Sequence, residues 1–145
     1  KMKTIIERVI GAQVTIRGSA IANIQNGYLI LAGFTHTDTE QTVQRMAEKI
    51  INLRIMADEN NKMNKTISET GGSILVVSQF TLYADTSGRR PGFQNSAKTE
   101  QATTLFDLFI KQLKLSQLNV QQGIFGEYMA VQSNNDGPLT LILDT

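Results

Sequence analysis

The chain has 145 residues, of which 41% are hydrophobic and 19% charged, a composition typical of one globular domain and not of a disordered or fibrous chain. It has no cysteine and a single histidine, which excludes disulfides, a thiolate nucleophile, a cysteine-based zinc site and a histidine-rich metal site. The net charge of +1 argues against a protein that coats nucleic acid through a broad positive field, but it permits contact with one end of an RNA.

The first third of the chain predicts β-strands. Arg17-Gly18-Ser19 and Asn26-Gly27 are turn sequences, and the runs beside them are rich in β-branched residues that alternate with polar ones. The run after the second turn is almost continuously apolar, which is typical of a buried strand. We expect strands at residues 5–10, 14–16, 20–24 and 28–34.

Two amphipathic helices are expected farther along the chain. The first covers residues 38–53, because Thr37 and Glu40 fit a capping box and apolar residues follow at helical spacing. The second carries an apolar stripe from Ala102 to Leu113.

A strand at residues 73–82 is expected between these helices. Its residues 74–77 are too apolar for a half-exposed strand, so it belongs in the centre of a sheet. A loop of functional length follows at 85–96. Further strands are expected at 120–125, 128–132 and 139–143, the last two joined by a loop at 133–138.

The order of these elements predicts an α/β fold. We expect one domain over residues 1–145, with packed mixed and antiparallel β-sheets and the two amphipathic helices on the outside. No apolar run approaches the ~20 residues of a membrane span, so we expect no membrane association and a cytoplasmic location. His36 lacks nearby carboxylates and is expected to be a solvated loop residue.

The polar end of the predicted central strand is a candidate site. Ser78, Gln79 and Thr81 follow the apolar run directly, although a buried polar group without a partner costs about 1–3 kcal/mol. These side chains therefore either cross-link neighbouring strands or line a pocket at the strand end.

The segment 134–140 is a second candidate. Its Asn, Asp and Gly residues are typical of a hairpin loop, with a proline at the start of the next strand. Gly137 before Pro138 also leaves two carbonyl groups almost unshielded, which suits a backbone that approaches a ligand closely. Of the basic residues, Arg89 and Arg90 are the best candidates for phosphate contacts, because they share a loop with Phe93; a plain solvated surface is the alternative.

At these two segments the chain resembles the D-aminoacyl-tRNA deacylase family. The signature stretches are Ser78-Gln79-Phe80-Thr81-Leu82-Tyr83-Ala84-Asp85 and Asn135-Asp136-Gly137-Pro138-Leu139-Thr140. Supporting matches are Glu7-Arg8-Val9, Lys62-Met63-Asn64 and Arg90-Pro91-Gly92-Phe93, so the similarity spans nearly the whole chain.

The resemblance implies hydrolysis of the ester that joins a D-amino acid, or glycine mischarged on tRNA(Ala), to the 3′ end of tRNA. It implies a homodimer with active sites at the subunit interface and no metal or cofactor. A cis Gly137–Pro138 would reach into the partner's pocket, bind the substrate's α-amino group through carbonyl groups and reject L-amino acids by steric clash. Arg8 would orient this loop, and Phe93 would stack on the terminal adenine.

The same resemblance places catalysis at Ser78, Gln79, Phe80 and Thr81. Backbone N–H groups near Phe80 and Thr81 would stabilise the tetrahedral charge, while the 2′-hydroxyl of the RNA would position or activate water. We expect Thr81 to form part of the pocket wall, because it has no local base.

Two other functions are open. A non-catalytic module could bind the acceptor end of tRNA through Ser78, Gln79 and Arg90, although near-neutral charge disfavours binding through phosphate contacts alone. A serine or threonine amidohydrolase of small molecules would need a second titratable base, which the sequence does not offer.

Overall fold

The computed structural model describes all residues, 1–145, and contains one main β-sheet, a two-stranded sheet and three α-helices. The elements, in chain order, are β1 (Lys3–Ile16), β2 (Ser19–Ile24), β3 (Gly27–Gly33), α1 (Glu40–Asn52), β4 (Met56–Ala57), β5 (Met63–Lys65), α2 (Ile67–Thr70), β6 (Ser73–Ser78), the 3-10 helix η1 (Phe80–Tyr83), α3 (Thr99–Lys114), β7 (Val120–Gln122) and β8 (Ala130–Asp144). The predicted α/β class, with amphipathic helices outside a mixed sheet, is confirmed.

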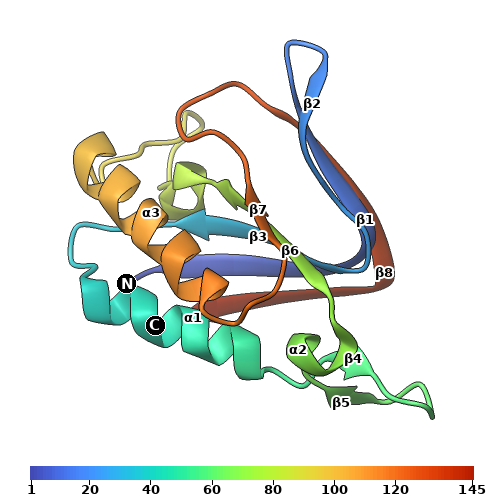
Figure 1. Ribbon diagram of the computed structural model, residues 1–145. Helices are drawn as coiled ribbons and strands as arrows, with labels where there is room; N and C mark the ends of the chain where they lie inside the picture. Colours follow the sequence, from blue (N-terminus) through green and yellow to red (C-terminus); the bar gives the residue numbers. More distant parts are fainter.

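The main sheet has the order β2-β1-β3-β6-β7, and β8 pairs along the other side of β1. The pairs of β1 are antiparallel, whereas β3 and β6, and β6 and β7, are parallel. The long strands β1 and β8 bend together, and the sheet curls until β2 stands well away from the plane of β3 (Figure 1). The register of β1 and β8 shifts between Glu7 and Val9 and again between Val9 and Gly11. The two strands bend at these irregularities.

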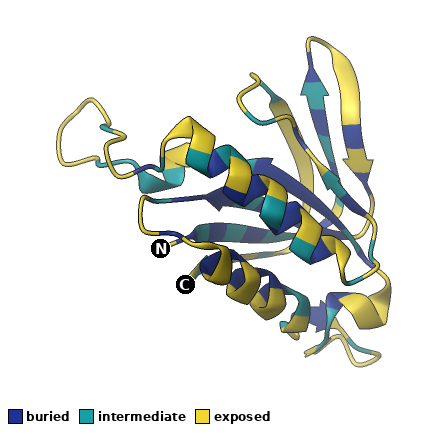
Figure 2. Cartoon of the chain, turned by 60° about the vertical axis from the view of Figure 1, so that its left-hand side comes forward, coloured by how far each residue is buried: buried dark blue, intermediate teal, exposed yellow.

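Each face of this curled sheet contributes to a buried apolar cluster. On one face α1 and α3 lie side by side, with their buried residues toward the strands and their polar residues outward (Figure 2). This core is the larger and includes Tyr28, Phe106 and Phe109, all at most 1% exposed. The other face encloses a smaller cluster with Val14, Leu75 and others inside the curl.

The cap of α1 differs from the predicted one. Thr39 is the N-cap and forms a capping box with Thr42, so the helix begins at Glu40 and not at residue 38. Asp38 is buried instead, and its carboxylate accepts a hydrogen bond from the backbone N–H of Thr35 at 2.7 Å. The predicted Thr37–Glu40 box is therefore wrong, because the chain around Asp38 turns inward and the helix starts after Thr39.

The predicted loop at 133–138 is wrong. Strand β8 is continuous through it, because β1 is long enough to pair with residues on both sides of the shifts in register. Pro138 fits there because β8 has no strand on its outer side, so a missing N–H breaks no ladder. Residues 5–10 and 14–16 likewise form one strand, β1.

The structure differs from the prediction at two further points, both between α1 and α3. The predicted strand at 73–82 ends at Ser78 and continues as η1. The polar region before it contains a short third helix, α2, with Thr66 and Glu69 as a capping box and Gly71 in the left-handed conformation at its end. None of the helices has the length and apolar character that crossing a membrane requires.

Candidate active site

A cleft of about 440 Å³ opens where β3 and β6 end. These strands are parallel neighbours, so their carboxyl ends, Gly33 and Ser78, lie at the same edge of the sheet, where α/β proteins commonly bind ligands. The cleft is lined by Ala32, Gly33, Phe34, Ser78, Gln79, Phe80, Phe93, Ser96, Ala97, Lys98, Thr99, Ala102, Phe125 and Gly126. It is therefore an apolar, aromatic cavity with a polar rim, the usual character of a small-molecule site.

A larger hollow, of about 540 Å³, lies on β1, β2 and β8. Its lining is Gly11, Ala12, Gln13, Asn23, Gln132, Ser133 and Asn134, which contains no ionisable side chain and no aromatic ring. Of these two, the cleft at the sheet edge is the better candidate for chemistry, because it combines aromatic surface with polar groups.

Three residues of the predicted catalytic segment, Ser78, Gln79 and Phe80, line the cleft, whereas Thr81, expected in the pocket wall, does not. Gln79 follows β6, donates its backbone N–H to the carbonyl of Ala32 at 2.8 Å, and is the N-cap of η1 without a side-chain cap. Phe80 and Thr81 are the first residues of η1, and the first N–H groups of such a turn have no acceptor within it. These two N–H groups can therefore stabilise a developing oxyanion.

Thr81 lacks a base. Its Oγ1 accepts a hydrogen bond from the amide Nε2 of Gln79 at 2.6 Å, and an amide nitrogen cannot take a proton from it. Nε2 of His36 lies 2.7 Å from the carbonyl oxygen of Gln94, so this imidazole nitrogen must donate there. The arrangement holds the Thr81 hydroxyl in place without activating it as a nucleophile.

The loop that follows brings Phe93 to the same cleft. Asp85 and Gly92 exchange two backbone hydrogen bonds of 2.8 and 2.9 Å, which close the loop at its base. The rings of Phe80 and Phe93 meet edge to face with centroids 5.0 Å apart, and they are 54% and 39% exposed. Ser96 Oγ donates to the carbonyl of Phe80 at 2.9 Å, so the loop is tied to η1. An exposed aromatic surface fixed in this way suits stacking of a nucleobase.

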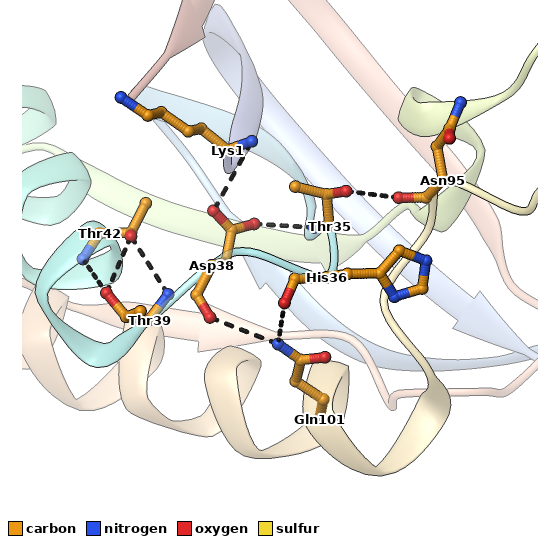
Figure 3. Close-up of polar contacts among 8 residues, drawn as sticks. All are labelled: Lys1, Thr35, His36, Asp38, Thr39, Thr42, Asn95 and Gln101. Atoms are coloured by element: carbon orange, nitrogen blue, oxygen red, sulfur yellow. Dashed lines mark hydrogen bonds and ion pairs between the residues drawn. The ribbon is translucent and has the colours of Figure 1, made fainter.

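The far end of this loop is held by the turn before α1 (Figure 3). Thr35 Oγ1 donates to the carbonyl of Asn95, while Nε2 of Gln101 donates to the carbonyls of His36 and Asp38 at 3.1 and 3.3 Å. Burial raises the pKa of Asp38, against the lowering effect of the Thr35 N–H and of the nearby chain terminus. Asp38 thus supports the turn, and His36 lies exposed upon it.

Arg89 and Arg90 lie exposed in the same loop but do not line the cleft. Neither forms an ion pair with another residue of the chain. Their guanidinium groups are therefore open to an external anion.

The Gly137–Pro138 segment lies elsewhere. The middle of β8 is on the right of Figure 1, whereas the N-terminal end of α3, which lines the cleft, is on the left. The Gly137–Pro138 peptide bond is cis, and both residues are exposed. Arg8 donates from Nε to the carbonyl of Asp136 at 3.2 Å and also lies 3.3 Å from its carboxylate. Arg8 therefore contacts this segment, but one chain does not bring it to the cleft.

Some residues of the cleft gave no signal in the sequence. Lys98 is the N-cap of α3, and Phe125 follows β7, yet both line the cleft because α3 begins there and the segment after β7 returns to it. Ser96 was part of a predicted loop without an assigned role. No three His, Cys, Asp or Glu side chains gather where they could hold a metal ion.

Comparisons with known proteins agree with the resemblance seen in the sequence. A family model described as D-Tyr-tRNA(Tyr) deacylase matches residues 5–144. A D-aminoacyl-tRNA deacylase of Bacillus velezensis is 48% identical over 145 residues and covers 99% of each chain. One from Clostridioides difficile is 46% identical and covers 99% of this chain and 97% of its own.

Solved structures share the fold. The c-Myc DNA Unwinding Element Binding Protein is 37% identical, with a TM-score of 0.93 over 99% of this chain and 98% of its own. A second structure, described as a "probable eukaryotic D-amino acid tRNA deacylase", has a TM-score of 0.89 at 14% identity, which supports the fold alone.

These relatives define a class of hydrolases that act on aminoacyl-tRNA. The chain belongs to the D-Tyr-tRNA(Tyr) deacylase family. It is therefore an enzyme with D-aminoacyl-tRNA deacylase function, and its substrate is aminoacyl-tRNA.

Proposed function

We propose that the cleft binds the 3′-terminal aminoacyl-adenosine of tRNA and hydrolyses the ester of a D-amino acid, or of glycine mischarged on tRNA(Ala). One observation carries this proposal: the first turn of η1 begins at Phe80, which with Phe93 forms an exposed aromatic pair that lines an apolar cleft. Residues 1–145 act as one deacylase domain in the cytoplasm, where aminoacyl-tRNA is made and used.

Catalysis depends on charge stabilisation and on the RNA. Water attacks the ester carbonyl, and the N–H groups of Phe80 and Thr81 stabilise the negative charge on the tetrahedral oxygen, an effect of about 3–4 kcal/mol per donor in other hydrolases. The 2′-hydroxyl of the terminal adenosine positions or activates this water, and the 3′-hydroxyl leaves. Ser78 and Gln79 form the polar rim, and Thr81 is held by Gln79.

Chirality is read by Gly137 and Pro138 of a second subunit. In one chain this segment is exposed and does not line the cleft, so a homodimer that inserts it into the partner's cleft completes both sites. Carbonyl groups of the segment bind the α-amino group, and the same backbone clashes with an L side chain. Arg8 orients the segment through the Asp136 carbonyl.

Binding of the tRNA end uses the loop beside the cleft. Phe93 stacks on the terminal adenine, and Arg89 and Arg90 contact phosphates of the acceptor end. These contacts are local, in keeping with the net charge of +1.

Single-turnover hydrolysis of D- and L-tyrosyl-tRNA tests this function. We expect rapid release of D-tyrosine and very slow release of L-tyrosine. Cleavage of neither substrate at saturating protein would instead support a non-catalytic module that binds the acceptor end.

Thr81→Ala separates two catalytic schemes in the same assay. We expect a rate within about tenfold of wild type, since only a side-chain contact is lost and the backbone N–H remains. Complete loss of activity in a folded Thr81→Ala protein would show that Thr81 is the nucleophile.

Mixing two variants tests whether the site is shared between subunits. A Gly137→Val protein and a Gln79→Ala protein, each with reduced activity, are unfolded together and refolded. Because a mixed dimer contains one intact composite site, about a quarter of the wild-type activity should return. No gain over the separate variants would exclude a shared site.

A further inference from the structure

The hairpin of β4 and β5 lies beside the bend of β8, at the lower right of Figure 1. It carries the stretch Lys62-Met63-Asn64, which the proposed chemistry does not use. The strands have two and three residues and pair at only two positions, Met56 with Lys65 and Ala57 with Met63. A two-stranded ribbon of this size is only marginally stable by itself, so side-chain contacts across it matter for its stability.

One side chain spans the base of this hairpin. Arg54 donates from Nε to the backbone carbonyl of Asn64 at 2.9 Å and from Nη2 to the side-chain Oδ1 of the same residue. Asn64 lies between Met63 and Lys65, at the shift in register, so these two contacts tie Arg54 to the irregular part of the strand pair. They fix the backbone just before β4, where Arg54 and Ile55 adjoin.

The next residue, Ile55, connects the hairpin to the chirality segment. Its carbonyl accepts a hydrogen bond of 2.8 Å from Nη1 of Arg8, while Nε of Arg8 donates to the carbonyl of Asp136. The Arg8 side chain is only 14% exposed, so its guanidinium is held from two sides in a fixed fork. Nη2 of Arg8 lies 3.1 Å from the position that a Cβ on Gly137 would take.

We propose that Asn64 is a positioning residue for chiral selection, acting through Arg54, the Ile55 carbonyl and Arg8 on the Gly137–Pro138 segment. The inference rests on the proposed function of that segment. Loss of the Asn64 side chain removes the acceptor of Arg54 Nη2, loosens the chain just before β4 and lets the Ile55 carbonyl move. Arg8 then loses a fixed acceptor, and the backbone it holds at Asp136 gains freedom. The donors on η1 belong to another part of the chain and keep their geometry.

Asn64→Ala tests this inference, with Asn60→Ala as the matched control. Asn60 lies in the turn of the same hairpin, is exposed, and makes no hydrogen bond through its side chain. Single-turnover rates with D- and L-tyrosyl-tRNA give the D/L ratio. We expect Asn64→Ala to lower this ratio about three- to tenfold, the range for one lost hydrogen bond, and Asn60→Ala to leave it unchanged. An unchanged ratio in Asn64→Ala overturns the inference.

A double-mutant cycle that combines Asn64→Ala with Arg8→Lys shows whether Asn64 acts through Arg8. A lysine keeps the positive charge but cannot form the fork, so the D/L ratio should fall and Asn64→Ala should then lower it no further. Equal effects of Asn64→Ala in both backgrounds would mean that the residue acts elsewhere, and would overturn the inference. Arg54→Ala provides a second cycle, because the double variant with Asn64→Ala should match the Arg54→Ala single variant.

These outcomes separate the inference from the proposed function. A wild-type protein without D/L discrimination, or an Arg8→Lys protein with an unchanged ratio, would overturn both. A fall with Arg8→Lys but none with Asn64→Ala would overturn only the role of Asn64.

Discussion

The cleft and the Gly137–Pro138 segment are built in different ways, although both are proposed to act on one ester. The cleft draws part of its lining from three consecutive residues, Ser78 to Phe80, where a buried strand ends and a helical turn begins. The Gly137–Pro138 segment depends on contacts between residues distant in sequence, Arg8, Ile55 and Asp136. In the proposed function, local geometry therefore suffices for charge stabilisation, whereas discrimination between enantiomers requires tertiary contacts and a second subunit.

Of the substitutions that test this comparison, Gly137→Ala should have the largest effect on activity. Gly137 has a φ of 121°, and an added Cβ would lie 3.1 Å from Nη2 of Arg8 and 3.2 Å from the backbone nitrogen of Leu139. Strain of about 1–3 kcal/mol would displace the segment and lower kcat/KM for D-tyrosyl-tRNA about 10- to 100-fold. The measurement is steady-state hydrolysis, with the thermal unfolding temperature as a check on folding.

Gly11→Ala is the matched control for this substitution. Gly11 lies on β1, opposite β8, the strand that carries Gly137. A Cβ added to Gly11 would meet only the Ile24 carbonyl, at an ordinary 3.6 Å. The variant should behave as wild type. Equal activity and selectivity in Gly137→Ala would remove Gly137 from chiral selection.

Phe93→Ala addresses the other region and should have a smaller effect. Stacking of a base on an aromatic ring contributes about 1–3 kcal/mol, so KM for D-tyrosyl-tRNA should rise tenfold or more while the D/L ratio stays the same. Tyr128→Ala is the control, because Tyr128 is 96% exposed and does not line the cleft. A change in the D/L ratio with Phe93→Ala would contradict the separation of binding from chiral selection.

The same contrast explains what could be predicted from the sequence. The buried strand at 74–77 and the polar residues after it were found from composition alone, and the structure places Ser78, Gln79 and Phe80 on one cleft. The continuity of β8 could not be found in this way, because Asn, Asp, Gly and Pro are typical of loops. Pairing with the equally long β1 overrides that local preference.

Contacts between residues distant in the chain also could not be predicted from the sequence. The resemblance implied that Arg8 orients the Gly137–Pro138 loop, but nothing in the sequence indicates the two carbonyl groups that it contacts, those of Ile55 and Asp136. The same holds for Lys98 and Phe125, which join the cleft because α3 begins there and the segment after β7 returns to it. Signature residues are recognisable in the sequence, whereas their supporting contacts depend on the folded backbone.

The smallest predicted effect concerns pH and the loop that carries Phe93. The N–H of Ser87, its hydroxyl and the Gln94 amide hold the pKa of Asp85 below its ordinary value. A folded-state pKa below the unfolded one means that the ionised carboxylate adds stability above about pH 4, and that this stability is lost as the pH falls through the folded value.

Asp85→Asn removes this titration while keeping an acceptor oxygen. The difference in the free energy of unfolding between wild type and Asp85→Asn should be constant from pH 7 to about pH 5 and should shrink below about pH 4, as measured by urea denaturation. Asp107→Asn, in α3, tests whether any lost carboxylate gives the same profile. If the difference for Asp85→Asn grew on acidification, the Asp85 contacts would not stabilise the folded loop. Because the Asp85 carboxylate holds the side chain of Gln94, the neighbour of Phe93, acid should loosen Phe93 before it affects the buried Gly33 and Val77.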